Sequence, residues 1–167
     1  MISPEYAQQM ARYNRWQNSS VYEAATSLTD AQRRQDTGAF FGSIHATLNH
    51  LVWADQMWMH RFAGTGLPLA ASITDSVTGY AEWQLLREAR VRFDDVIDAW
   101  TGELDRAWLE GDLTWFSGAT GRELRKPKSI LVMHMFIHQT HHRGQVHCML
   151  TQLGAKPADT DLAFMPG

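Results

Sequence analysis

The chain has 167 residues and a net charge of −3, with 44% hydrophobic and 20% charged residues. This length predicts one domain, residues 1–167, and the composition excludes disordered and low-complexity classes. The weakly acidic balance argues against nucleic acid as the main partner. The single cysteine, Cys148, excludes an intramolecular disulfide and a multi-cysteine zinc site, and we expect it to be a small buried residue.

The first ten residues and the rest of the chain carry no visible targeting or anchoring signal. The segment from Met1 to Met10 is polar and lacks the apolar stretch of a secretory signal. No apolar run approaches the roughly 20 residues that cross a bilayer. We therefore expect a cytoplasmic protein with no membrane partner.

Apolar residues recur at helical spacing in four segments. The first helix is expected to follow Pro4, and Thr29 to Gln32 has the pattern of a capping box that opens a short helical turn. The segment from Gly111 to Lys128 breaks the helical pattern and is either a small hairpin or an irregular loop. The predicted long helices are Pro4–Leu28, Phe40–Phe62, Gly79–Trp108 and Lys128–Leu153.

Four long helices with almost no strand signal predict an all-α protein, a four-helix bundle with a short irregular or hairpin segment before the last helix. Metal sites in such bundles form from side chains on facing helices. The Pro- and Asp-containing tail, residues 156–167, is expected to lie on the surface of the bundle.

Histidine is the most informative residue type, because the chain contains eight and most lie near the predicted last helix. His138 and His142 are four residues apart and share one helix face, so two imidazoles can reach one metal ion. His134 lies one turn earlier on the same stripe. His141 is expected at an interface or the surface, and His147 is expected to be structural. Two ligands make a weak site, so a third must come from another helix.

The candidates for the third ligand are His45, His50 and His60, on the second helix or at its end. His45 and His50 are five residues apart, so roughly 140° separates them around the helix axis and only one can face the pair. The helical wheel does not choose between them, because both sides of this helix are apolar.

Two stretches resemble the signatures of the DinB family, a group of DinB/YfiT-like metalloenzymes. These are HQTHHRGQV from His138 to Val146 and GSIHATLNHL from Gly42 to Leu51. The two motifs stand in the family's order and spacing. Further matching segments cover essentially the whole chain: Leu28–Arg33, Trp53–Asp55, Trp58–Phe62 and Asp161–Pro166.

The resemblance implies a four-helix bundle, often a homodimer, that holds a divalent ion with three histidines. Carried over to this chain, the ligands are His50, His138 and His142, with His45 as the alternative to His50. Zinc, nickel and iron all suit such ligands. Relatives within the superfamily use low-molecular-weight bacterial thiols as transferase substrates, so the implied substrates are a small-molecule thiol and an electrophile.

Three imidazoles leave a coordination position open, which is the arrangement of catalytic sites. Such a site serves thiol transfer or metal-dependent hydrolysis. A hydrolase usually needs a carboxylate as general base, and Asp55, the nearest in sequence to His50, lies about 140° away on the wheel. The chain also lacks an HExxH motif, which weakens the hydrolase hypothesis. A third hypothesis is a non-catalytic bundle that binds a metal or small ligand, and a fourth is a structural dimer whose histidines are incidental.

Four further residues are candidates for the pocket or for supporting the ligands. His134 and Trp58 are expected to line the pocket, or His134 to hydrogen-bond a ligand. Asp55 is expected to orient another group. Arg143 pairs either with an acidic substrate or, as we favour, with an Asp of a neighbouring helix.

Overall fold

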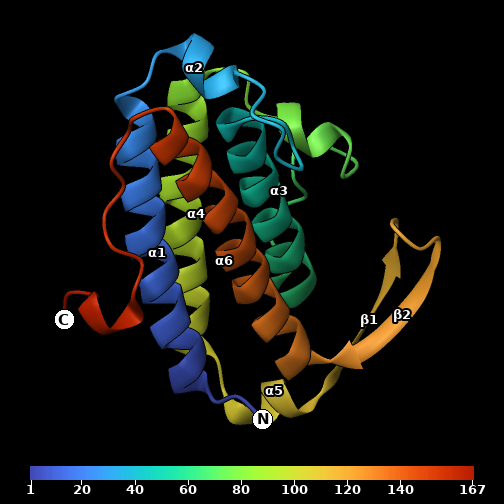
Figure 1. The fold of residues 1–167 in the computed structure, drawn as a ribbon. Helices are drawn as coiled ribbons and strands as arrows, with labels where there is room; N and C mark the ends of the chain where they lie inside the picture. The colour runs from blue at the N-terminus through green and yellow to red at the C-terminus, as the bar shows by residue number, and fades with distance from the viewer.

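The computed structural model describes residues 1–167 and is mostly helical. Its four long helices lie side by side, and α1 and α3 each pack against both α4 and α6 (Figure 1). These helices are α1 (Pro4–Thr26), α3 (Ile44–Ala63), α4 (Trp83–Glu103) and α6 (Lys128–Gln152). The shorter elements are α2 (Asp30–Arg34), η1 (Asp75–Thr78), α5 (Arg106–Glu110), β1 (Asp112–Ser117), β2 (Arg122–Pro127) and η2 (Leu162–Phe164).

Capping residues explain where two helices depart from the prediction. Helix α3 begins at Ile44 and not at Phe40, because the Ser43 hydroxyl accepts a hydrogen bond from the Ala46 amide and caps the helix. The expected Gly79–Trp108 helix is wrong at both ends. Leu104 and Asp105 are extended, and Asp105 caps the separate helix α5 by accepting from the Trp108 amide at 2.6 Å.

The segment before the last helix is a hairpin and not an irregular loop. Strands β1 and β2 pair antiparallel from Asp112 opposite Pro127 to Ser117 opposite Arg122. Gly121 takes a φ of +64°, which a side chain rarely adopts, and closes the turn. The hairpin reaches away from the end of α6 on the side of α3 (Figure 1).

The core consists of two apolar clusters with a polar layer between them. On each long helix, buried polar residues stand between the stretch that enters one cluster and the stretch that enters the other. Three of the charges in this layer pair with one another: Arg90 contacts Asp55 at 2.7 Å and Asp94 at 2.9 Å. The layer comprises Asn14, Asn18, Asp55, Arg90, Asp94, Gln139 and Arg143. It lies in the same part of α3 and α6 as the histidine motifs, where the Gln139 side chain of α6 donates to the carbonyl of Leu51 on α3 at 3.3 Å.

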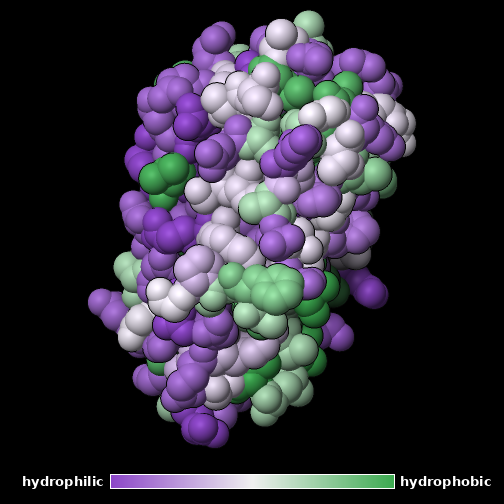
Figure 2. Space-filling model, turned by 60° about the vertical axis from the view of Figure 1, so that its left-hand side comes forward, coloured by the Kyte–Doolittle hydropathy of each residue, from purple (hydrophilic) through white to green (hydrophobic).

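The C-terminal tail, which the sequence predicts only to lie on the surface, runs along α1. The Tyr13 hydroxyl donates to the carbonyl of Thr160 at 2.6 Å, and the Gln17 side chain donates to the carbonyl of Asp159 at 2.9 Å. The face on this side is largely hydrophilic, with a small apolar group near its lower end (Figure 2).

Cys148 is exposed, which corrects the expectation of a buried thiol. None of the helices combines the length and apolar character that crossing a membrane requires.

Candidate metal centre

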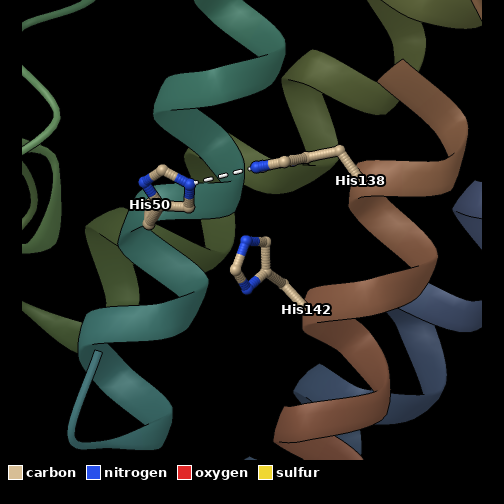
Figure 3. A group of neighbouring side chains, drawn as sticks. All are labelled: His50, His138 and His142. Carbon is tan, nitrogen blue, oxygen red and sulfur yellow. Dashed lines mark hydrogen bonds between the residues drawn. The ribbon is translucent and has the colours of Figure 1, made fainter. Parts of the chain in front are cut away.

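Helices α3 and α6 bring His50, His138 and His142 together. One ring nitrogen from each lies within 4.8 Å of the others, and the side chains point toward one another across the gap between the helices (Figure 3). The Nε2 atoms of His50 and His138 are 3.2 Å apart. His50 and His142 are buried, and His138 is half-buried.

The proton on His50 is fixed by a residue of η1. The Ser76 hydroxyl lies 2.6 Å from the carbonyl of Ile73 and 2.8 Å from Nδ1 of His50. Because a carbonyl only accepts, Ser76 donates its single proton to Ile73 and must accept from the imidazole. Nδ1 of His50 therefore carries the proton, and Nε2 presents its lone pair to His138.

The same logic applies to His142. Its Nδ1 lies 2.8 Å from Oε1 of Gln145, and the amide nitrogen of Gln145 lies 3.4 Å from Nε2 of His141. With Gln145 in this orientation, its oxygen accepts from Nδ1–H of His142. The remaining nitrogen of His142, Nε2, is thus an unprotonated donor atom for a ligand.

Burial keeps these imidazoles neutral. It lowers the pKa of His50 to about 4 and that of His138 to about 3, with repulsion from neighbouring imidazoles as a further cause. Burial also lowers the pKa of His142, although its hydrogen bond to Gln145 acts in the opposite direction. Neutral imidazoles are the form that ligates metals.

The donor set fits a divalent ion. Two nitrogens that ligate one zinc ion tetrahedrally at about 2.0–2.1 Å lie about 3.3 Å apart. The Nε2 atoms of His50 and His138 have nearly this separation, 3.2 Å. Nδ1 hydrogen bonds that orient the rings, as Ser76 and Gln145 provide, are the usual support of histidine ligands.

A family comparison agrees with these motifs. The model of the DinB family matches residues 1–166. The chain belongs to the DinB family. It is 24% identical over 157 residues to Protein DinB of Bacillus subtilis (strain 168), covering 94% of this chain and 91% of that one. It also resembles the crystal structure of a DinB-like protein from Bacillus cereus ATCC 10987, with a TM-score of 0.55 and 21% identity, over 86% of this chain and 90% of the other. At this identity the likeness concerns the fold.

A cavity of about 680 Å³ adjoins the histidines of this DinB chain. His50 and His138 are among its lining residues, and so are His134 and Trp58, whose rings are 5.2 Å apart. The loop before η1 and the end of the hairpin, residues 71–74 and 115–119, cover the other sides. His134 and Trp58 are both candidates for the pocket from the sequence, and the cavity volume is typical of small-molecule sites.

The other candidates lie away from this cavity. Nε2 of His45 lies 2.9 Å from the carbonyl of Tyr80, so the structure brings His50 and not His45 to the pair. Asp55 is buried against Arg90 in the polar layer, where it orients an arginine and not an imidazole. Arg143 donates to Asn14 and Gln139, which corrects the expected salt bridge with an Asp.

Sequence reasoning missed the partners that orient the DinB histidines. The contact of Gln145 with His142 is predictable from spacing, because Gln145 stands three residues after His142 and therefore next to it on the helix surface. The contact of Ser76 with His50 is not predictable from spacing, since only the folding of the η1 loop onto α3 brings the two residues together. The sequence predicts Phe41 inside a helix, whereas it precedes α3 and its ring centre lies 4.1 Å from that of His50 and 5.2 Å from that of His142.

Proposed function

We propose that this chain binds one divalent ion through His50, His138 and His142 and uses it to transfer a small thiol to an electrophile. The observation that carries the proposal is the convergence of three imidazoles, two of which have their Nδ1 protons held by Ser76 and Gln145. Zinc, nickel and iron are the candidate ions, since imidazole suits all three.

A divalent ion held by three imidazoles supplies an open coordination position, at which the pKa of a bound thiol or water falls. The residues of the chain provide the rest. Ser76 and Gln145 orient the rings, and Trp58 and the hairpin shield the cavity from water. In the transfer, the thiol loses its proton to solvent and its sulfur forms a bond to the electrophilic carbon. The bond from that carbon to the leaving group breaks, and the leaving group departs as an anion with the bonding electron pair.

The cavity favours thiol transfer over hydrolysis. No Asp or Glu lines it, so a hydrolase would lack the carboxylate general base that usually activates water. The alternatives are a metal-dependent hydrolase in which an imidazole such as His134 takes that role, and a bundle that binds a metal or small ligand without turnover.

We also propose that the four long helices form one DinB/YfiT-like four-helix bundle domain that acts as a homodimer in the cytoplasm. Exposed apolar residues on α6 support a dimer, because Ile130 and Ile137 lie on its outer surface. Light scattering at micromolar concentration tests it, and a monomer mass would contradict it.

Elemental analysis of protein purified without a tag or chelator tests the metal site. We expect about one equivalent of metal in the wild type and none in His50→Ala or His138→Ala. His147→Ala is the matched control, because His147 lies on α6 but lines a different cavity with Tyr13. Full occupancy in His138→Ala would refute the ligand assignment.

Turnover separates an enzyme from a binding protein. The metal-loaded protein is mixed with a low-molecular-weight bacterial thiol and an aryl halide, and thioether formation is followed by absorbance. We expect a rate that disappears in His138→Ala and persists in His147→Ala. A metal-loaded wild type with no rate above the uncatalysed reaction for any thiol tested would favour the binding protein.

A further inference from the structure

We propose that the cavity beside the histidines takes an elongated, small organic anion with an apolar or aromatic body, and that Arg61 binds its anionic group. The inference deepens the proposed function by naming the ligand class of the same site. It rests on the proposed function only in placing the far end of the ligand at the histidines.

The charges that line the cavity select an anion. Arg61 is the one lining residue with a permanent charge, and no Asp or Glu lines the cavity. The nearby Asp75 accepts a hydrogen bond from Ser72 at 2.7 Å and lies outside the lining. A cationic ligand would meet Arg61 without a counter-charge, whereas a carboxylate or similar anion would supply one.

Two indole rings position the Arg61 guanidinium so that it can bind such a group. Its guanidinium carbon lies 4.7 Å from the ring centre of Trp58 and 5.8 Å from that of Trp115. The chain gives it no ion pair, and burial without a compensating charge lowers its pKa. Stacking on indole uses the faces of the guanidinium and leaves its edge N–H groups free, and these groups match a carboxylate in a two-pronged contact.

The arrangement of the cavity fixes the shape of the ligand. Arg61 follows His50 by eleven residues, so their Cα atoms are about 16 Å apart along the axis of α3. The Arg61 guanidinium lies over Trp58, one turn nearer to the histidines. Between the two, α3 contributes Ala54 and Trp58, and the hairpin contributes Trp115. A ligand that reaches from Arg61 to the histidines is therefore long and lies against apolar and aromatic surface.

A second cavity provides the contrast. It has about 640 Å³ and is lined by α1 and α4, but it carries both signs of charge, including Glu23 and Asp94 beside arginines. Arg87 in this cavity is half-buried and forms no ion pair, like Arg61, but it has no indole beside it. This makes Arg87 the matched control.

The test measures how strongly the protein prefers an anion to a neutral molecule of the same shape. Calorimetric titrations use 2-naphthoate and its neutral isostere 2-naphthamide as probes, with wild type, Arg61→Gln, Arg61→Lys and Arg87→Gln. Each titration is run on protein as purified and after chelator treatment, because an ion at the histidines would itself attract a carboxylate.

We expect naphthoate to bind the wild type about tenfold more tightly than naphthamide, since a hydrogen bond between two charged groups is stronger than one to a neutral amide. In the chelator-treated protein, the preference should vanish in Arg61→Gln, fall in part in Arg61→Lys and persist in Arg87→Gln. Equal binding of both probes to the wild type, binding of neither, or an unchanged preference in Arg61→Gln would overturn the inference.

The metal content of the same samples is measured separately by elemental analysis. A protein that holds one equivalent of metal but shows no Arg61-dependent preference would sink this inference and leave the proposed function standing. A protein without metal that shows the preference would support the inference and contradict the proposed function.

Discussion

Ser76 accepts a hydrogen bond from Nδ1 of His50 at 2.8 Å while it donates its own proton to Ile73 at 2.6 Å. This pair of bonds leaves one tautomer for His50, with its lone pair on Nε2. The loop that carries Ser76 therefore determines whether the nitrogen facing His138 can act as a ligand.

Replacement of this hydroxyl should weaken the metal site without removing a ligand. We expect Ser76→Ala to bind the metal about 10-fold to 100-fold more weakly, the usual cost of losing such a partner. A competition titration with a coloured chelator measures the affinity. Ser72→Ala is the control from the same loop, because Ser72 bonds Asp75 and no imidazole. Equal affinities in Ser76→Ala and the wild type would show that the tautomer is set elsewhere.

Gln145 should act on His142 in the same sense. Its Oε1 accepts from Nδ1 of His142, so a carboxylate there would make the ring more basic and Gln145→Leu would leave the proton without a partner. We expect metal affinity in the order Gln145→Glu, wild type, Gln145→Leu, with the last about tenfold below the wild type. The same chelator competition ranks them, and no difference among the three would argue that this hydrogen bond is incidental.

Two of the three clustered histidines are predictable from the sequence alone because they are encoded locally. His138 and His142 share a face by their four-residue spacing alone. The choice of His50 over His45 needed the family resemblance, because the helix is apolar on both sides. The hydrogen bond between His45 and the Tyr80 carbonyl explains that choice physically. It holds the His45 ring on the side of α3 that faces α4, away from His138 and His142.

Most of the fold was also predictable, for the same local reason. Helix ends set by glycine and hydroxyl caps agreed within a few residues, as at Thr26 and Gln152. The break at Leu104 was missed because apolar periodicity continues into α5, and only the backbone turn at Asp105 interrupts the helix. The buried polar layer could not be predicted, because each helix shows only one or two of its residues and their partners are distant in sequence.

Acid should destabilise the metal-free protein through the buried imidazoles. The pKa is about 4 for His50 and about 3 for His138 in the folded chain, below the value of about 6.5 for an unfolded chain. Below pH 6.5 the unfolded state binds protons at these residues that the folded state does not bind. The free energy of unfolding should therefore fall as the pH drops from about 6.5 toward 4, and it should be insensitive to these groups above 7.

Urea unfolding in the presence of chelator, between pH 7.5 and 5, measures this slope. The double variant His50→Gln, His138→Gln should show a shallower fall than the wild type. His147→Gln, altered on the same helix but outside the cluster, should keep the wild-type slope. The slope is the readout, so a general loss of stability in the double variant does not obscure the result. Identical slopes in all three proteins would mean that other groups cause the acid sensitivity.

Loss of one charge in the polar layer should lower the free energy of unfolding more than loss of a charge at the surface. Arg90 is buried between Asp55 and Asp94, so Arg90→Met leaves two buried carboxylates without a counter-charge. Removing one partner of a buried ion pair costs about 3–5 kcal/mol, whereas an exposed pair is worth about 0–1 kcal/mol. We expect the larger loss for Arg90→Met and a negligible one for Arg92→Met, whose arginine is exposed on the same helix and lies 3.9 Å from Glu88.

A triple variant separates charge from packing in this layer. Asp55→Asn and Asp94→Asn, combined with Arg90→Met, remove all three charges at nearly constant volume, so part of the lost stability should return. Urea unfolding compares the four proteins at pH 7.5. If the triple variant were less stable than Arg90→Met, the hydrogen bonds of the carboxylates, such as that from Asn18 to Asp94 at 2.9 Å, would outweigh the cost of their burial.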